Sequence, residues 1–437
     1  MSTSTSSPPP GGAEAKPRLP RLPVSPTHFG LNLIALAVVL AMVFLMRAKI
    51  LHPKDPVLVL CAGAALPVVL VDVLVLKVHR RASTGLDWDG AFAPDFARIA
   101  TKLLGLVVTV APFALFYWAT PEYQGSFYDP LWSRLRALWP VLVVAAVFYV
   151  TLIDTLMKEP RDAYWTLGRL ALGRFEEVAG KGPLLANHFR GWLVKGYFFP
   201  LMFVWLCGGT RNVMGYDFAG AAWTNLRVYA FLYDFIFFFD LLFATVGYVV
   251  SFRALDTHIR SAESTMLGWT VALFCYEPFF RGLFEKAYIQ YGGNSFESWL
   301  ADYPYLRQAW GAAVIFLVLV YVLSTITFGV RFSNLTHRGI LTNGPYRFTK
   351  HPAYVSKNLS WWLTAVPFLV MDGNVGAAIK RCLGLLMMNF IYFMRARTEE
   401  RHLSHDPTYV QYALWMNEHG VLRVLNRVPV LRYRAPD

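Results

Sequence analysis

The stretch WGAAVIFLVLVYVLSTITFGV, Trp310 to Val330, carries no charged side chain over 21 positions. A helix rises about 1.5 Å per residue, so about 20 apolar residues cross the roughly 30 Å hydrocarbon core of a bilayer. The stretch therefore predicts a membrane-spanning helix. Apolar windows of the same kind recur along the chain and predict ten spans, at 29–46, 57–76, 101–120, 137–157, 190–208, 229–252, 264–280, 309–330, 354–371 and 376–394.

The composition indicates the same class of protein. Of the 437 residues, 56% are hydrophobic and only 16% are charged, a balance that is unusual for a soluble globular chain. We therefore expect an all-α, polytopic integral membrane protein. Nucleic-acid binding would need basic residues concentrated on a soluble domain. The net charge is +13, but the predicted spans leave no soluble domain of sufficient size, which argues against this function.

The basic residues are divided unevenly between the two sides of the predicted spans. Of the 41 Lys and Arg residues, 29 fall on the side of the N-terminus and 12 on the other side. Because cytoplasmic loops carry the excess of basic residues, we expect both termini in the cytoplasm.

The chain divides into four predicted segments. Residues 1–27 are rich in Ser, Pro and Gly and are expected to form a disordered cytoplasmic tail. Residues 28–308 form an N-terminal transmembrane domain of unknown role, 309–425 a C-terminal core and 426–437 a tail. Within the core, a turn at MDGNVG joins the last two spans into a helical hairpin.

The four cysteines give no sign of a metal site or a disulfide framework. They lie in or beside apolar runs, without a C-x-x-C pair or histidines at metal-ligand spacing. We expect them to act as small core residues: Cys61, Cys207, Cys275 and Cys382.

Two polar stretches flank the predicted hairpin. The first is LTNGPYRFTKHPAYVSKNLSWWL, Leu341 to Leu363, and the second is FMRARTEERHLSHDPTYVQY, Phe393 to Tyr412. In the second, Arg395 and Glu399 are four residues apart and share one face of a helix, which by itself indicates only an ordinary surface pair.

Taken together, the two stretches resemble the isoprenylcysteine carboxyl methyltransferase (ICMT) family and its bacterial relatives. That family combines G-P-Y-R, then R-H-P-x-Y, two membrane helices, R-x-x-x-E-E-x-x-L and two tyrosines. The resemblance covers roughly 310–425, with Lys350 where the family usually has Arg and a shorter segment between Leu403 and Tyr409. The matching residues are Gly344, Pro345, Tyr346, Arg347, His351, Pro352, Tyr354, Arg395, Glu399, Glu400, Leu403, Tyr409 and Tyr412.

The resemblance implies a membrane methyltransferase that uses S-adenosylmethionine on a lipidic or prenyl-like acceptor. It implies Arg395 and Glu399 as catalytic residues, with Arg395 holding an anionic acceptor. The cofactor-binding residues implied are Tyr346, Lys350, His351, Pro352, Tyr354, Glu399, Glu400, Tyr409 and Tyr412. Donors among them suit the carboxylate of the cofactor's methionine moiety, carboxylates suit its ammonium or ribose, and aromatic rings suit adenine or the sulfonium.

Other ionisable residues have plainer interpretations. Arg347 and Lys357 are expected to reach toward lipid headgroups, as long basic side chains do at helix ends. Asp234 and Asp240 lie in an apolar span, where they are either interior hydrogen-bonding groups or residues of a substrate cavity.

Two other functions stay open. Membrane sterol-type reductases end in a similar His-Pro segment with a hairpin and bind NADPH, although EERHL fits the methyltransferase better. A receptor or transporter that kept the fold without the activity is the non-enzymatic alternative. The sequence leaves the acceptor, the role of the N-terminal helices, the membrane and the oligomeric state undetermined.

Overall fold

The computed structural model describes residues 21–217, 225–282, 295–370 and 373–436. In this part of the chain, eight helices are long and apolar enough to cross a membrane. The fold is helical, and its described strands, β1 (Ser261–Ala262) and β2 (Thr336–His337), have two residues each. The predicted all-α, polytopic membrane fold is confirmed. The eight helices are α1 (Phe29–Arg47), α2 (Pro56–Leu74), α3 (Phe96–Ala119), α4 (Asp129–Leu156), α6 (Gly182–Gly215), α7 (Asn225–Val249), α10 (Pro304–Phe328) and α12 (Val375–Leu403).

The other two predicted spans contain shorter helices. In 264–280 the helix is α8 (Met266–Leu273), with 8 residues, and in 354–371 it is α11 (Pro352–Ala365), with 14. At about 1.5 Å per residue, helices of this length reach only roughly 12 and 21 Å. Helix α11 ends at Ala365, and the next residue, Val366, has a φ of 35° and precedes a proline. Proline disfavours the helical conformation in the residue before it, so the apolar run continues while the helix stops.

Contacts between side chains fix the relative directions of the helices in the C-terminal half. Asp240 of α7 bonds Thr325 of α10 nearer their C-terminal ends, and Gly311 of α10 lies beside Tyr229 nearer their N-terminal ends, so α7 and α10 run parallel. Helix α11 is antiparallel to α10, because Lys357 lies near Tyr321 whereas the carbonyl of Leu363 lies near Trp310. The end of α7 and the start of α10 are therefore at opposite ends of the pair, and the chain returns between them.

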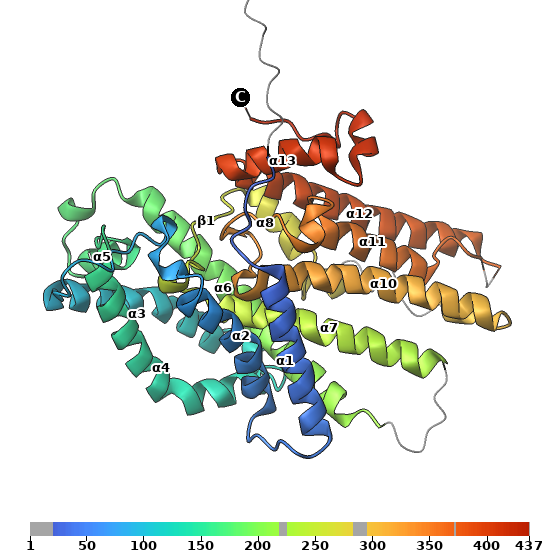
Figure 1. The fold of residues 1–437 in the computed structure, drawn as a ribbon, viewed down its shortest axis with the longest axis horizontal. Coiled ribbons are helices and arrows are strands. Elements are labelled where there is room, and N and C mark those ends of the chain that lie inside the picture. The colour runs from blue at the N-terminus through green and yellow to red at the C-terminus, as the bar shows by residue number, and fades with distance from the viewer. Residues whose placement is uncertain (1–20, 218–224, 283–294, 371–372, 437) are drawn as a thin grey trace, which may run out of the picture.

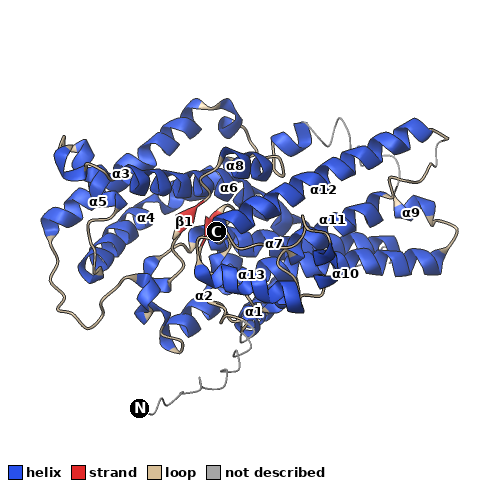
Figure 2. Ribbon diagram, turned by 90° about the horizontal axis from the view of Figure 1, so that it is seen from above, coloured by secondary structure: helices blue, strands red, loops and turns tan. Residues whose placement is uncertain are grey.

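The helices form two groups with three helices between them (Figure 1). Helices α3, α4 and α5 (Ala163–Ala171) lie on one side, α10, α11 and α12 on the other, and α1, α2 and α6 between. Figure 2 shows β1 in the middle of the molecule, between the two groups. Within the first group, two glycines let the backbones of α3 and α5 touch: a Cβ on Gly105 would lie 1.8 Å from the Tyr164 carbonyl oxygen, and one on Gly168 would lie 1.9 Å from that of Thr101.

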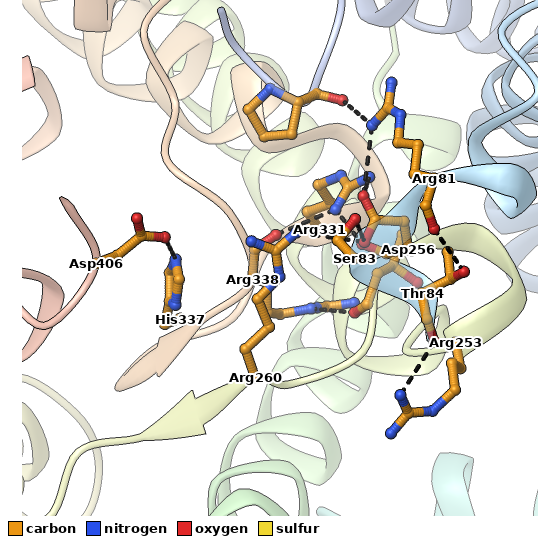
Figure 3. Close-up of polar contacts among 12 residues, drawn as sticks. Arg81, Ser83, Thr84, Arg253, Asp256, Arg260, Arg331, His337, Arg338 and Asp406 are labelled. Atoms are coloured by element: carbon orange, nitrogen blue, oxygen red, sulfur yellow. Dashed lines mark hydrogen bonds and ion pairs between the residues drawn. The ribbon is translucent and has the colours of Figure 1, made fainter. Parts of the chain in front are cut away.

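A buried polar junction ties the loop after α7 to the end of α10 (Figure 3). Asp256 forms ion pairs with Arg81, Arg260 and Arg331 at 3.3–3.4 Å. Burial alone would raise the pKa of Asp256, but Arg331 and the other donors around it hold the pKa below its ordinary value. The neighbouring Arg338 donates to five backbone carbonyls, those of Gly247, Val250, Thr257, Val330 and Phe332. Gly247 lies in the last turn of α7, where carbonyls lack a partner within the helix, and Val330 and Phe332 lie just after α10.

The described part of the predicted N-terminal tail, residues 21–27, lies against the C-terminal core. The carbonyl of Pro23 accepts a hydrogen bond from Thr342, at 2.7 Å, and that of Thr27 accepts one from the Asn343 side chain, at 2.6 Å. Residues 1–20 and Met371 and Asp372 of the predicted hairpin turn lie outside the described residues. The tail was expected to be disordered up to residue 27, whereas its last residues pack beside the first polar stretch.

Candidate functional site

The first polar stretch begins with a turn that requires glycine. Gly344 has a φ of 53°, and a Cβ there would lie 2.5 Å from the Thr327 hydroxyl and 2.9 Å from the ring of Phe29. A side chain at this position would both strain the backbone and collide with α10 and α1. The turn continues as the short helix Gly344–Arg347 and places the Tyr346 ring 5.6 Å from that of Phe328.

Helices α11 and α12 are held side by side by amide and indole groups. The Trp362 indole donates to Asn389 at 2.8 Å, and the Asn389 amide donates to Asn358 at 2.5 Å. These contacts set the register of the antiparallel pair. As a result, the start of α11, with His351 and Tyr354, lies beside the end of α12.

Glu400 is the centre of a buried ion-pair cluster at that end. Its carboxylate lies 2.6 Å from the Lys350 ammonium, 3.2 Å from His351 Nε2 and 2.9 Å from Arg397 Nη1. The carboxylate is 6% exposed. If the carboxylate were removed, Lys350, His351 and Arg397 would lose this partner. Glu400 therefore links α12 to the 350–351 turn.

Glu399 faces a different way from its neighbour. One of its oxygens accepts a hydrogen bond from the Tyr354 hydroxyl at 2.6 Å, and its side chain is 39% exposed. The His351 ring stacks on that of Tyr354, with centroids 5.4 Å apart and planes 4° apart. Glu399 therefore keeps accepting capacity that Glu400 has already used.

Arg395 is buried among aromatic rings. It is 7% exposed, and its Nη2 donates to the Asn334 side chain at 2.6 Å. Its guanidinium carbon lies 5.7 Å from the ring centroid of Tyr276, 5.1 Å from that of Tyr354 and 5.9 Å from that of Tyr392. Within the described residues no carboxylate forms an ion pair with Arg395. Cation–π contacts and one amide oxygen hold it in place, with further donors free for an anion.

Two tyrosines of α13 (Pro407–His419) also belong to the site. The Tyr412 hydroxyl donates to the Tyr346 carbonyl at 2.6 Å. The Tyr409 hydroxyl is buried and has no hydrogen-bond partner among the described residues. Burial raises the pKa of Tyr346, Tyr409 and Tyr412, so all three stay neutral at physiological pH.

These side chains line one cavity between α10, α11, α12 and α13. Of the residues singled out in the sequence, the cavity brings together Tyr346, Lys350, His351, Tyr354, Arg395, Glu399, Tyr409 and Tyr412. Pro352 and Glu400 do not line it. Pro352 is the buried first residue of α11, and Glu400 points to the other side of α12, where it lines a second cavity.

Sequence reasoning missed several residues of this cavity. Tyr392 precedes Arg395 by three residues on one helix, so the spacing could have predicted it. Asn334 and Tyr276 come from a loop and from the segment after α8, and no local pattern marks them. Lys357 was expected among lipid headgroups, but it lines the cavity instead.

Residues 307–405 match the isoprenylcysteine carboxyl methyltransferase (ICMT) family. The matched ICMT segment contains most of α10 and all of α11 and α12. It therefore includes His351, Arg395 and Glu399. It covers less than a quarter of the 437 residues, and α13 with its two tyrosines lies outside it. Comparisons with curated proteins and with solved structures find no match. The similarity to the ICMT family thus lies in the part of the chain that supplies most of the cavity.

Proposed function

We propose that the protein transfers a methyl group from S-adenosylmethionine to a hydrophobic acceptor that carries an anionic oxygen. The observation that carries this proposal is the cavity of the ICMT segment. In it, a buried arginine that has no carboxylate partner among the described residues and a glutamate with free accepting capacity lie among aromatic rings.

The residues present fit such a cofactor. The buried hydroxyls of Tyr409 and Thr336 lack partners among the described residues, and both residues line the cavity. An unpaired buried hydroxyl is costly, so a polar ligand would stabilise the site. Glu399 would accept from the cofactor's ammonium or ribose. His351 and Lys350 would donate to its carboxylate with the capacity that Glu400 leaves, and Tyr346 and Tyr354 offer aromatic faces to adenine or the sulfonium.

The cofactor supplies an activated methyl group, and the protein supplies positioning. Arg395 would hold the acceptor oxygen in line with the methyl group. An oxygen that is already ionised needs no general base, so the acceleration comes mainly from orientation. The surrounding rings of Tyr276, Tyr354 and Tyr392 would keep water away from the reacting atoms.

We place the cavity on the cytoplasmic side of the membrane. The support for this is the uneven distribution of Lys and Arg, of which 29 belong to the side of the N-terminus and 12 to the other. An acceptor with a hydrocarbon chain would reach the cavity from the bilayer.

A binding measurement separates this function from the reductase and the non-enzymatic alternatives. Protein purified in detergent should bind S-adenosylhomocysteine, measured by calorimetry, and should not bind NADPH. Glu399→Gln should weaken S-adenosylhomocysteine binding tenfold or more, because a charge-assisted hydrogen bond is worth about 1.5–3 kcal/mol. The control is Glu418→Gln, which changes an exposed carboxylate of α13. Binding of NADPH, or an equal affinity of the two variants for S-adenosylhomocysteine, would contradict the proposal.

A further inference from the structure

Lys357 is a basic residue of the cavity that the proposed function does not use. It lies on α11, with its ammonium 5.0 Å from the ring centroid of Tyr321 and 5.5 Å from that of Trp361. It does not extend toward the membrane surface as the sequence suggested. Within the described residues its ammonium has no hydrogen bond and no ion pair.

The carboxylate bonded to Tyr321 does not pair with Lys357 directly. Asp240 of α7 accepts hydrogen bonds from the hydroxyls of Tyr321, at 2.9 Å, and Thr325, at 2.5 Å. No oxygen of Asp240 lies within 4.0 Å of the Lys357 ammonium nitrogen, so the two side chains form no ion pair. Asp240 thus keeps Tyr321 in place beneath the ammonium and attracts it from a distance, while the ammonium's three donors stay available.

Lys357 and Arg395 lie beside the same group of aromatic rings. Trp361, beside Lys357, lies 5.6 Å from Tyr392, and Tyr392 lies beside Arg395. Both basic residues line the same cavity, and neither has a carboxylate ion pair among the described residues. Two like charges repel each other, and burying a charge without a partner is costly. An anion placed between them would offset both costs.

We infer that Lys357 is a further acceptor-binding residue, which acts with Arg395 on two oxygens of the acceptor's anionic group and so selects an oxyanion over an amine or an alcohol. This inference rests on the proposed function and adds a specificity-determining residue to it. An amine acceptor would meet two cations and be repelled, and a neutral alcohol would leave both unpaired.

The reaction balances for such an acceptor. A lone pair on one acceptor oxygen forms the new bond to the methyl carbon while the carbon–sulfur bond breaks and its electron pair stays on sulfur. The product is an ester with one negative charge fewer than the acceptor, together with S-adenosylhomocysteine. Because the two cations then hold a less charged group, the product binds more weakly than the substrate and can leave.

Calorimetry on the full chain with S-adenosylhomocysteine bound tests the inference. The probes share one hydrocarbon chain and differ in the headgroup: dodecyl phosphate, dodecanoate, dodecylamine and dodecanol. The wild type should prefer the two anions, and comparing phosphate with carboxylate tells which lipid class the site favours. Lys357→Met should weaken anion binding about tenfold or more. Lys357→Arg, which keeps the charge, should restore most of it.

Controls separate this inference from misfolding and from the proposed function. Lys158→Met changes an exposed lysine and should bind anions as the wild type does. Lys357→Met should melt no lower than the wild type, since it removes a half-buried charge that has no ion pair among the described residues and keeps the side-chain volume. Equal anion binding by the wild type and Lys357→Met, or tighter binding of dodecylamine than of either anion, overturns the inference. Loss of S-adenosylhomocysteine binding by the wild type would count against the proposed function instead.

Discussion

At the scale of single residues, Arg395 separates acceptor binding from cofactor binding. Arg395→Lys keeps the charge but loses the planar, multi-donor guanidinium that Asn334 and three rings hold in one orientation. The acceptor would then sit less firmly, and a misplacement of about 1 Å can cost about a hundredfold in rate. Arg395→Lys should therefore lose most turnover, measured as transfer of a labelled methyl group to extracted lipids, and keep its affinity for S-adenosylhomocysteine.

Arg401→Lys is the matched control, because Arg401 is exposed near the end of the same helix. It should leave both turnover and cofactor affinity unchanged. Near-normal turnover of Arg395→Lys at saturating cofactor, together with lost S-adenosylhomocysteine binding, would show that Arg395 holds the cofactor and not the acceptor.

How far residues could be predicted depends on where their partners lie in the chain. Arg395, Glu399 and His351 stand in recognisable spacings, so the sequence placed them in one candidate site. It could not separate Glu399 from Glu400, because the difference arises from the rotation of α12 against the 350–351 turn. The position of Lys357 in the cavity was equally hidden, since it depends on α7 and α10 packing against α11.

At the scale of elements, the Gly344 turn carries a prediction about stability. Gly344→Ala should lower the melting temperature for two reasons, a left-handed backbone that costs an alanine about 1–2 kcal/mol and a collision with Thr327 and Phe29. Gly373→Ala has the first cost only, because Gly373 has a φ of 72° with nothing within 4 Å of its added Cβ. Thermal unfolding in detergent should rank the wild type first, Gly373→Ala second and Gly344→Ala last. Equal decreases in melting temperature in the two variants would mean that α1 and α10 move enough to make room for the new methyl group.

The two short helices show what apolar runs alone can and cannot predict. The windows at 264–280 and 354–371 are apolar enough for spans. Their helices nevertheless stop early, α11 at the Val366-Pro367 pair and α8 at Leu273. Hydropathy measures the preference for the bilayer, whereas helix length also depends on backbone conformation, which averaged windows ignore.

At the scale of the whole molecule, the path of the chain can be tested by labelling. If only the eight long helices cross the membrane, residues 305 and 348 lie on opposite sides with residue 305 cytoplasmic. If the stretches containing α8 and α11 also cross, the sides are exchanged and residue 348 is cytoplasmic. The parallel α7 and α10 and the antiparallel α11 favour the second arrangement. So does the His351–Glu400 contact, which puts residue 348 at the same end as the end of α12.

We therefore expect ten passages, with residue 348 facing the cytoplasm. Single cysteines would replace the exposed Tyr305 and Phe348 in a chain whose four native cysteines have been removed. A thiol reagent that cannot cross the membrane should label position 305 in intact cells and position 348 only after permeabilisation. The opposite pattern would leave eight passages and place the cavity outside the cytoplasm. Labelling of both positions from one side would mean that α10 does not span the membrane, although its segment from Pro304 to Arg331 is among the most apolar of the chain.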